Sequence, residues 1–286
     1  MLKQRIITAL LLIPIVLGGI FLLPADYFAW ALVPIFLIAG KEWGRLIDST
    51  CNATQWTFTV TIGVLMVALN ILVPVEHIWF NSQLHPIYMA IITIGIFWWI
   101  ISSVLVSTYP KSGKLWQKSH MMKSMFGQLT LLPCFAALIA LNAISAQADP
   151  YFGGTLVFLV MLVVWTTDTG AYFAGRQFGK RKLMPNVSPA KTLEGLLGGL
   201  VATMLIVAGV MYYSPEQELG LVVVVTLVTA LASAFGDLSE SMFKRAANIK
   251  DSGTILPGHG GILDRIDSLT AALPVFAFIY VSMWMS

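Results

Sequence analysis

The sequence predicts an all-α, polytopic integral membrane protein. Apolar residues occupy 57% of its 286 positions, charged residues occupy only 11%, and the mean hydropathy is +0.81. Soluble domains carry a charge at about a quarter of their positions, so this composition excludes an ordinary soluble protein. About 20 apolar residues form one helix across the bilayer, and the chain contains about nine such stretches.

The expected spans follow one another with short polar connections. The second is the shortest, contains Pro34 and is separated from the first only by Pro24, Ala25 and Asp26. It is compatible with one arm of a tight hairpin and with a partly re-entrant helix, so the count is eight or nine. The nine expected spans are residues 6–23, 27–41, 56–74, 87–108, 124–142, 154–174, 194–213, 218–239 and 268–285.

All 17 Lys and Arg residues fall in five segments, which alternate with segments that carry none. The positive-inside rule places such basic segments in the cytoplasm. The N-terminus is therefore expected in the cytoplasm and the C-terminus, Ser286, on the far side. Nine spans fit this alternation better than eight, since losing one would put basic loops on both sides. The basic segments hold Lys3 and Arg5; Lys41 and Arg45; Lys111, Lys114, Lys118 and Lys123; Arg176, Lys180, Arg181, Lys182 and Lys191; and Lys244, Arg245, Lys250 and Arg265.

The chain divides by content into two regions. Residues 1–142 are expected to form about five transmembrane helices, and residues 143–286 a catalytic membrane region with cytoplasmic loops at 175–193 and 240–267. Two cysteines, Cys51 and Cys134, are too few for a zinc site or a disulfide framework. The N-terminal basic residues precede a long apolar run without a small-residue cleavage site, which predicts an uncleaved anchor.

A polar block between the last two expected spans predicts a site at the membrane surface. Residues 236–268 hold five acidic and four basic side chains, and such groups are rare at membrane depth unless they are functional. Asp264 and Asp267 share one helix face at i and i+3, and Asp237 ends the preceding span. Three clustered carboxylates suit Mg²⁺. Helix caps and salt bridges to nearby basic residues are the alternative.

The basic residues of the same block predict phosphate binding. Arg grips phosphate oxygens bidentately and Lys acts as a point charge, so Lys244, Arg245 and Lys250 are candidates. Setting the membrane topology or attracting anionic headgroups is the alternative. The turn Pro257–Gly261 could bring backbone N–H groups close to a phosphate. His259, within it, is expected to contact phosphate or shape the turn rather than act as a base, because a phosphate monoester has a second pKa near 6.

A second polar patch precedes the seventh expected span. Ser188 or Thr192 can cap the following helix, and Lys191 can project toward an anion at its N-terminus. Gly195 and Gly199 permit close helix packing. Asp168 lies inside the sixth span, where a carboxylate costs roughly 2.5–3.5 kcal/mol at the helix centre. It is therefore expected to face a polar cavity with a partner.

The motifs resemble those of the phosphatidate cytidylyltransferases, or CDP-diacylglycerol synthases. The run from Ser241 to Asp267 is similar to the complete family signature, and the segments around Asp168 and Ser188–Gly195 resemble further family motifs. The resemblance implies transfer of CMP from CTP to phosphatidic acid with Mg²⁺, and room for a second metal ion, in a helical and often dimeric protein. It implies metal binding and catalysis by Asp237, Asp264 and Asp267, with catalytic Lys244 and Arg245. The implied substrate-binding residues are Asp168, Ser188, Lys191, Lys250, His259 and Arg265.

Two other functions would use similar charged residues. Another CTP-dependent lipid enzyme, similar to a CDP-archaeol synthase or a polyprenol kinase, would act on a different lipid. A transporter of an anionic solute is the non-enzymatic alternative, suggested by Asp168 within a span. In each case the chain is expected to be integral to a cell membrane, with the bacterial inner membrane as the expected location. Membrane lipid is an expected partner, and no nucleic-acid partner is expected.

Overall fold

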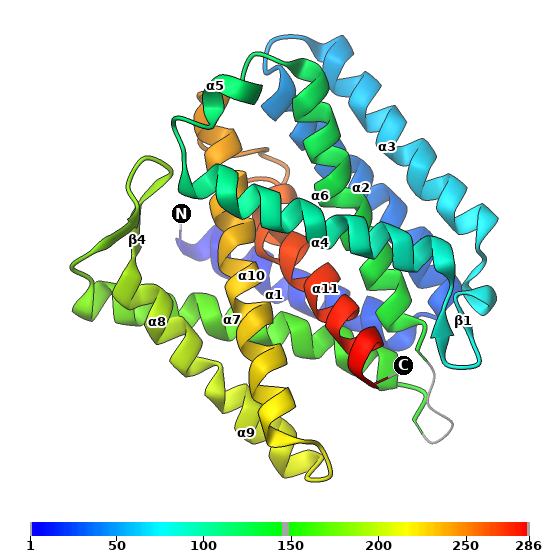
Figure 1. The fold of residues 1–286 in the computed structure, drawn as a ribbon. Helices are drawn as coiled ribbons and strands as arrows, with labels where there is room; N and C mark the ends of the chain where they lie inside the picture. Colours follow the sequence, from blue (N-terminus) through cyan, green and yellow to red (C-terminus); the bar gives the residue numbers. More distant parts are fainter. Residues whose placement is uncertain (1, 145–148, 285–286) are drawn as a thin grey trace.

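The protein is built almost entirely from helices (Figure 1), as the composition predicts. The computed structural model describes residues 2–144 and 149–284. Its helices are α1 (Leu2–Leu22), α2 (Ala25–Ile47), α3 (Asn52–Leu72), η1 (Val75–His77), α4 (Pro86–Ser107), α5 (Gly113–Trp116), α6 (His120–Asn142), α7 (Phe152–Phe178), α8 (Leu193–Ala202), α9 (Met204–Tyr213), α10 (Leu219–Ala246) and α11 (Leu263–Trp284). Two antiparallel hairpins pair β1 (Trp79–Phe80) with β2 (Gln83–Leu84) and β3 (Lys182–Met184) with β4 (Ser188–Thr192).

Seven segments of the described chain are helical, long and apolar enough to cross a membrane, which confirms a polytopic membrane protein. They are α3, α4, α6, α7, α8 with α9, α10, and α11 up to Met283. The second expected span lies within α2, a continuous helix of 23 residues that contains Pro34. It carries Lys41, Glu42 and Arg45 near its end, which lowers its apolar character. The total of nine spans stays a prediction.

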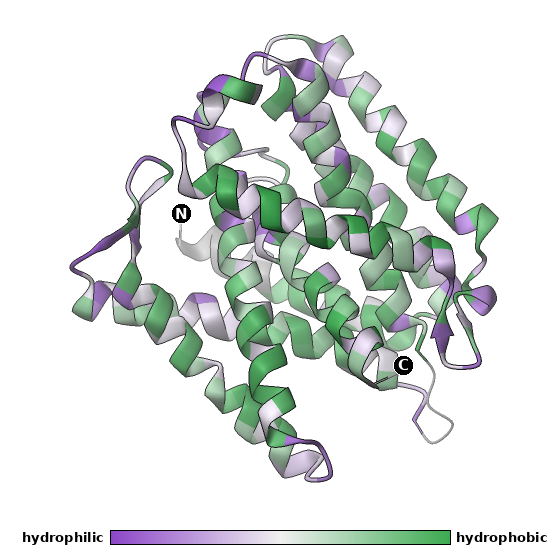
Figure 2. Cartoon of the chain, in the orientation of Figure 1, coloured by the Kyte–Doolittle hydropathy of each residue, from purple (hydrophilic) through white to green (hydrophobic). Residues whose placement is uncertain are grey.

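Polar segments gather at two opposite sides of the molecule. Figure 1 shows the N-terminus, α5 and the β3–β4 hairpin toward the left and upper left, the β1–β2 hairpin and the C-terminal end toward the lower right, and the α9–α10 turn at the bottom. Hydrophilic colouring marks both sets of turns, and the helices between them are mostly hydrophobic (Figure 2). The first set contains three of the five basic segments and the second contains no Lys or Arg, in agreement with the charge alternation of the sequence.

An aromatic cluster holds the ends of α2 and α10 together. The ring of Phe243 on α10 lies 5.1 Å from Trp43 on α2 and 4.9 Å from Trp116 on α5, centroid to centroid. Phe126 on α6 stacks on Trp98 of α4 at 4.6 Å. All five rings are nearly inaccessible, and buried aromatic pairs of this kind contribute about 0.5–1.5 kcal/mol each beyond area burial. Their packing fixes the polar end of α2 beside the polar end of α10.

Helices α7 and α8 pack closely because glycines line their contact. A Cβ on Gly199 would lie 2.6 Å from the Thr167 carbonyl oxygen, and one on Gly195 would lie 2.9 Å from the Ala171 carbonyl oxygen. The expected packing role of these two glycines is therefore confirmed. The seventh expected span is not one regular helix, however: it breaks into α8 and α9 at Thr203, whose hydroxyl donates to the Leu200 carbonyl oxygen at 2.7 Å.

The two expected cytoplasmic loops are shorter than predicted. The segment 240–267 is helical at both ends, because α10 continues to Ala246 and α11 begins at Leu263. The segment 175–193 begins within α7 and ends in β4 and the first residue of α8. Hydropathy locates only the apolar part of a helix, whereas polar residues at its end can continue the same backbone hydrogen bonds. Several candidate site residues therefore lie on rigid helices rather than on loops.

Candidate active site

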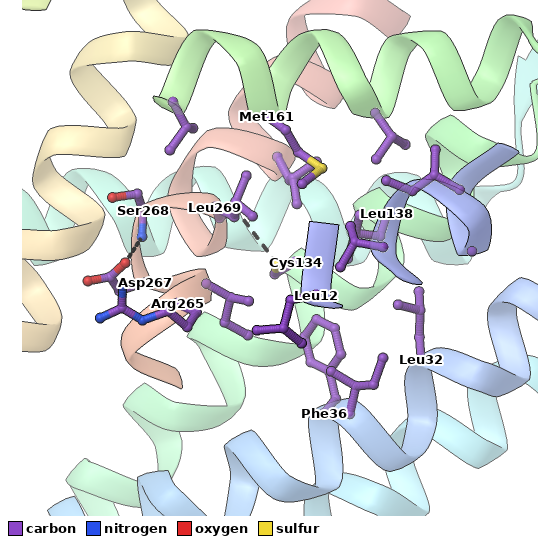
Figure 3. A pocket seen from close by; sticks show the side chains of 18 of the residues that line it. Leu12, Leu32, Phe36, Cys134, Leu138, Met161, Arg265, Asp267, Ser268 and Leu269 are labelled. Carbon is purple, nitrogen blue, oxygen red and sulfur yellow. Dashed lines mark hydrogen bonds between the residues drawn. The ribbon is translucent and has the colours of Figure 1, made fainter. Parts of the chain in front are cut away.

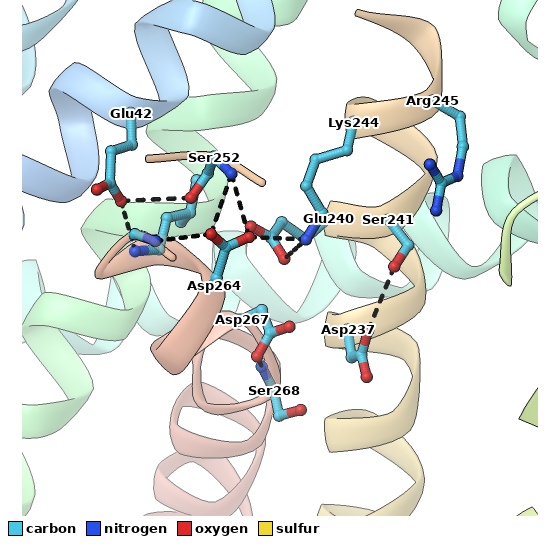
Figure 4. A network of polar contacts seen from close by, with 12 residues as sticks. Glu42, Asp237, Glu240, Ser241, Lys244, Arg245, Ser252, Asp264, Asp267 and Ser268 are labelled. Atoms are coloured by element: carbon cyan, nitrogen blue, oxygen red, sulfur yellow. Dashed lines mark hydrogen bonds and ion pairs between the residues drawn. The ribbon is translucent and has the colours of Figure 1, made fainter. Parts of the chain in front are cut away.

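One face of α10 presents the polar residues of the site. Asp237, Glu240, Ser241 and Lys244 are spaced at i, i+3, i+4 and i+7, which places them on a single helix face. This face is turned toward the first turns of α11, where Asp264 and Asp267 lie (Figure 4). The sequence brings these groups together because α10 and α11 are neighbours in the fold, joined by residues 247–262.

Lys244 lies at the centre of this cluster. Its Nζ is 2.9 Å from Glu240 Oε2 and 2.8 Å from Asp264 Oδ1. The side chains are 12%, 3% and 5% exposed, respectively, so water screens the charges poorly. Removing one partner of a buried charge pair costs about 3–5 kcal/mol, because the other charge stays buried without compensation. The three charges therefore depend on one another.

Backbone N–H groups fix the carboxylate of Asp264. The Gly261 N–H donates to Oδ2 at 2.8 Å, and the Ser252 N–H is within 3.2 Å of Oδ1 and 3.0 Å of Oδ2. Gly260 adopts a left-handed conformation with φ of 83°, which a glycine accommodates without strain. The turn was predicted to offer its N–H groups to a phosphate. The Gly261 N–H instead holds Asp264, because a carboxylate at the start of a helix satisfies unpaired donors.

The β3–β4 hairpin brings a second lysine to the site. Lys191 Nζ lies 2.5 Å from Asp237 Oδ2, so a residue of β4 is tied to a residue of α10. Asp168 on α7 lies close enough to interact electrostatically with both. Arg245, which is exposed, also contacts this hairpin: its Nε donates to the Val187 carbonyl oxygen at 3.2 Å.

A cavity of about 820 Å³ joins this polar cluster to an apolar channel (Figure 3). One end is polar, and the remaining wall is formed mainly by aliphatic and aromatic side chains of α1, α2 and α7. A molecule with a charged head and an apolar body would fit such a division. The polar end is lined by Asp168, Asp237, Lys244, Asp251, His259, Asp264, Arg265 and Asp267.

The structure brings together most of the predicted site residues. Seven of them line the cavity: Asp168, Asp237, Lys244, His259, Asp264, Arg265 and Asp267. Lys191 joins them through its ion pair with Asp237. Ser188, Arg245 and Lys250 are not in the cavity wall: Ser188 is paired in register with Met184 in the hairpin, and Arg245 and Lys250 are exposed. Asp168 was expected to face a polar cavity with a partner, and its place in this wall beside Asp237 and Lys191 agrees.

Two acidic residues of the cluster were missed by the sequence analysis. Glu240 lies within the polar block, and its i+4 spacing to Lys244 was the available signal. Glu42 lies in α2, far from the block in sequence, yet its carboxylate accepts the N–H groups of Ile262 at 3.1 Å and Leu263 at 2.7 Å. The only signal for Glu42 in the sequence was its position next to Lys41, two adjacent charged residues after an apolar run.

The cluster carries more negative than positive charge, which fits a cation. Seven carboxylates accompany three cationic side chains, those of Lys191, Lys244 and Arg265. Glu240 Oε1 is buried and accepts no hydrogen bond from the described residues. The predicted trio of metal ligands is not gathered at one point, however. Within residues 2–144 and 149–284, no three Asp, Glu, His or Cys side chains are arranged to hold one ion, because Asp237 and Asp264 are each paired with a lysine. Mg²⁺ suits this donor set, since it commonly uses one or two carboxylates and completes its shell with water and substrate phosphate.

Comparison with known proteins gives the family. The sequence profile of the cytidylyltransferase family matches residues 3–283. The chain is 37% identical to a phosphatidate cytidylyltransferase of Haemophilus influenzae, covering 98% of this chain and 99% of the relative. It is 43% identical to a phosphatidate cytidylyltransferase of Pseudomonas aeruginosa, covering 99% of each chain. A relative with the same description in Staphylococcus haemolyticus is 36% identical over 65% of this chain and 72% of its own length. The chain therefore belongs to the cytidylyltransferase family.

Proposed function

We propose that this protein is a phosphatidate cytidylyltransferase, an enzyme that converts CTP and phosphatidic acid into CDP-diacylglycerol and pyrophosphate. The observation that carries the proposal is the cavity, which has carboxylates and lysines at one end and apolar side chains along the rest of its wall. A phosphate head and two acyl chains match that division. The proposal agrees with the names of the relatives that align with nearly the whole chain.

In the proposed reaction, an oxygen of the lipid phosphate attacks the α-phosphorus of CTP. The new P–O bond forms as the bond between the α-phosphorus and the oxygen bridging to the β-phosphorus breaks, and pyrophosphate leaves with that electron pair. The lipid phosphate is largely a dianion at pH 7, since the second pKa of a phosphate monoester is near 6, so no side chain has to remove a proton. Lys244 and Lys191 supply positive charge where negative charge builds up on the departing group.

Mg²⁺ is part of this proposal, with room for a second ion beside the surplus carboxylates. One or two of the carboxylates of Asp237, Asp264 and Asp267 would hold each ion, and substrate phosphate and water would complete its shell. When bound, Mg²⁺ would neutralise phosphate charge and align the reacting oxygens. The Ser252 and Gly261 N–H groups orient Asp264 for this role, and the Ser268 N–H holds Asp267 Oδ1 at 2.7 Å.

The test is pyrophosphate release by the purified protein in lipid nanodiscs. We expect release only when CTP and phosphatidic acid are both present, and not with ATP, GTP or UTP. A panel of acceptors should include a phosphorylated archaeol lipid and a polyprenol, with CDP formation as the measurement for the polyprenol, because transfer of the γ-phosphate releases CDP rather than pyrophosphate. Turnover confined to either of these, or none with phosphatidic acid, would contradict the proposal.

We further propose that the protein is in the bacterial inner membrane, with the N-terminus and the active site at the cytoplasmic side. The alternation of the 17 basic residues along the sequence supports this orientation. The homodimer that the family resemblance implies is also part of this proposal, and light scattering of the solubilised protein is its measurement.

Alkaline phosphatase fused to the C-terminus is expected to be active, and green fluorescent protein fused there is expected not to fluoresce. The physical reason is that nine spans leave the two ends on opposite sides of the membrane. Alkaline phosphatase and green fluorescent protein fusions at Ser286, which lies outside the described residues, form a matched pair. Fluorescence without phosphatase activity would indicate an even number of spans.

His259→Asn is expected to lower turnover by about tenfold or less and to leave the pH–rate profile unchanged in shape. His259 lines the cavity, and its Nδ1 is buried without a hydrogen-bond partner in the described chain. A lost hydrogen bond to phosphate would account for the decrease. The acid limb should stay near pH 6, where the lipid phosphate ionises. Loss of that limb together with most of the activity would identify His259 as a general base.

A further inference from the structure

Glu42 links the N-terminal half of the chain to the polar cluster. It lies in the last turns of α2 and is only 5% exposed. Its Oε1 accepts the Ile262 N–H and its Oε2 accepts the Leu263 N–H. These donors open helix α11, where the first N–H groups have no partner within the helix. A carboxylate at this position is favoured by the helix dipole, so Glu42 fixes where α11 begins.

Ser252 connects Glu42 to Asp264. The Ser252 hydroxyl is 3.4 Å from Glu42 Oε2, and its backbone N–H donates to Asp264. One turn after Glu42, Arg45 donates through Nη1 to the Ser252 carbonyl oxygen at 2.8 Å. Ser252 is fully buried. The hydroxyl, the N–H and the carbonyl of Ser252 are therefore held by Glu42, Asp264 and Arg45, respectively. Figure 4 draws the contacts of Glu42 and Asp264.

The packing around the Glu42 carboxylate leaves no space for other side chains. A Cβ on Gly261 would lie 2.5 Å from both carboxylate oxygens of Glu42, and a Cβ on Gly253 would collide with Oε1. Real Cβ atoms do not approach an oxygen this closely. The two glycines thus let the segment 252–263 close directly around the Glu42 carboxylate, which touches backbone on both sides.

We propose that Glu42, assisted by Arg45, is a positioning residue for the reaction: it holds segment 252–263 so that Asp264 stays oriented toward Lys244. The expected effect on turnover rests on the proposed function. The expected loosening of segment 252–263 does not depend on it. Glu42 is not in the wall of the cavity and acts through Ser252, Ile262 and Leu263. Loss of its two acceptor oxygens would free the N-terminus of α11 and with it the carboxylate of Asp264.

Glu42→Gln is the sharpest test, because glutamine keeps the size but has one acceptor oxygen and a donor group in place of two acceptors. We expect the turnover number to fall at least about tenfold, with the KM for phosphatidic acid changed less than about threefold. Lys250 is exposed and lies two residues before the held segment. Trypsin cleavage after Lys250 should become at least about fivefold faster as the segment opens locally.

Asp48→Asn serves as the matched control. Asp48 caps the end of the same helix α2, where hydrogen bonds from the Thr50 hydroxyl and from the Thr50 and Cys51 N–H groups hold the pKa of its carboxyl below the usual range. Asparagine favours such a turn as well. We expect unchanged turnover and unchanged cleavage after Lys250, since none of these contacts reaches segment 252–263.

The outcomes separate the inference from the proposed function. If the wild-type protein releases no pyrophosphate with CTP and phosphatidic acid, the proposed function fails, and the cleavage rate still tests Glu42. If Glu42→Gln is within about twofold of wild type in both turnover and cleavage, the positioning role is wrong. Should that variant not accumulate in membranes, Arg45→Gln takes its place: faster cleavage after Lys250 is then expected, and a wild-type cleavage rate would overturn the inference.

Discussion

Replacing Asp264 with asparagine is expected to lower the turnover number at least about a hundredfold, which corresponds to about 2.7 kcal/mol of transition-state stabilisation. The Asp264 carboxylate accepts hydrogen bonds from Lys244 and from the Ser252 and Gly261 N–H groups. Asparagine has the same shape, but its amide NH₂ would face one of these donors. The negative charge of the Asp264 carboxylate would also be lost. The measurement is pyrophosphate release at saturating CTP, per mole of folded protein.

Two further variants define what this loss means. Asp267→Asn is expected to cause a loss of similar size, because Asp267 lies three residues further on the same helix and lines the same cavity. Asp26→Asn, in the exposed first turn of α2, should retain wild-type turnover. Asp264→Asn with near-normal turnover at modest Mg²⁺ would show that this carboxylate only caps α11 and pairs with Lys244.

The sequence could predict those site residues whose signal lies in their own stretch of the chain. Asp237, Lys244 and Asp264 come from one block of the chain, and charges this dense between two apolar runs indicate a common site. Asp168 was predictable for a similar reason, since a carboxylate within a span needs a polar environment. The structure places all four in the wall of one cavity.

The part that sequence could not predict depends on packing between distant segments. Glu42 precedes Ile262 by 220 residues, and nothing in the pattern of α2 indicates which helix end its carboxylate meets. The aromatic rings of Trp43 and Phe243 decide that contact by holding α2 against α10. Hydropathy also ended the eighth span near residue 239, although α10 continues to Ala246. Because of that extra helical length, Lys244 and Arg245 point in directions about 100° apart around α10, which their adjacency in sequence conceals.

Lys244→Met is accordingly expected to be far more damaging than Arg245→Met, although the two residues are neighbours with the same charge. Lys244 points toward α11 and lies between Glu240 and Asp264 (Figure 4), whereas Arg245 contacts the β3–β4 hairpin. Removing Lys244 leaves two buried carboxylates without a cation, at a cost of about 3–5 kcal/mol in stability. It also removes a fixed positive charge from the cavity wall, and we expect turnover per folded protein to fall at least about a hundredfold.

Arg245→Met provides the matched comparison for this last prediction. Its side chain is exposed, and the Nε contact with the Val187 carbonyl oxygen is the hydrogen bond it gives to the hairpin. Loss of that contact should loosen the hairpin that carries Lys191, and a decrease of about tenfold or less is expected. Turnover and thermal unfolding of both variants, measured in the same nanodiscs, separate the two effects. Equal losses of turnover would mean that positive charge near the end of α10 matters wherever it points, and the buried contacts of Lys244 would then have no special role in the reaction.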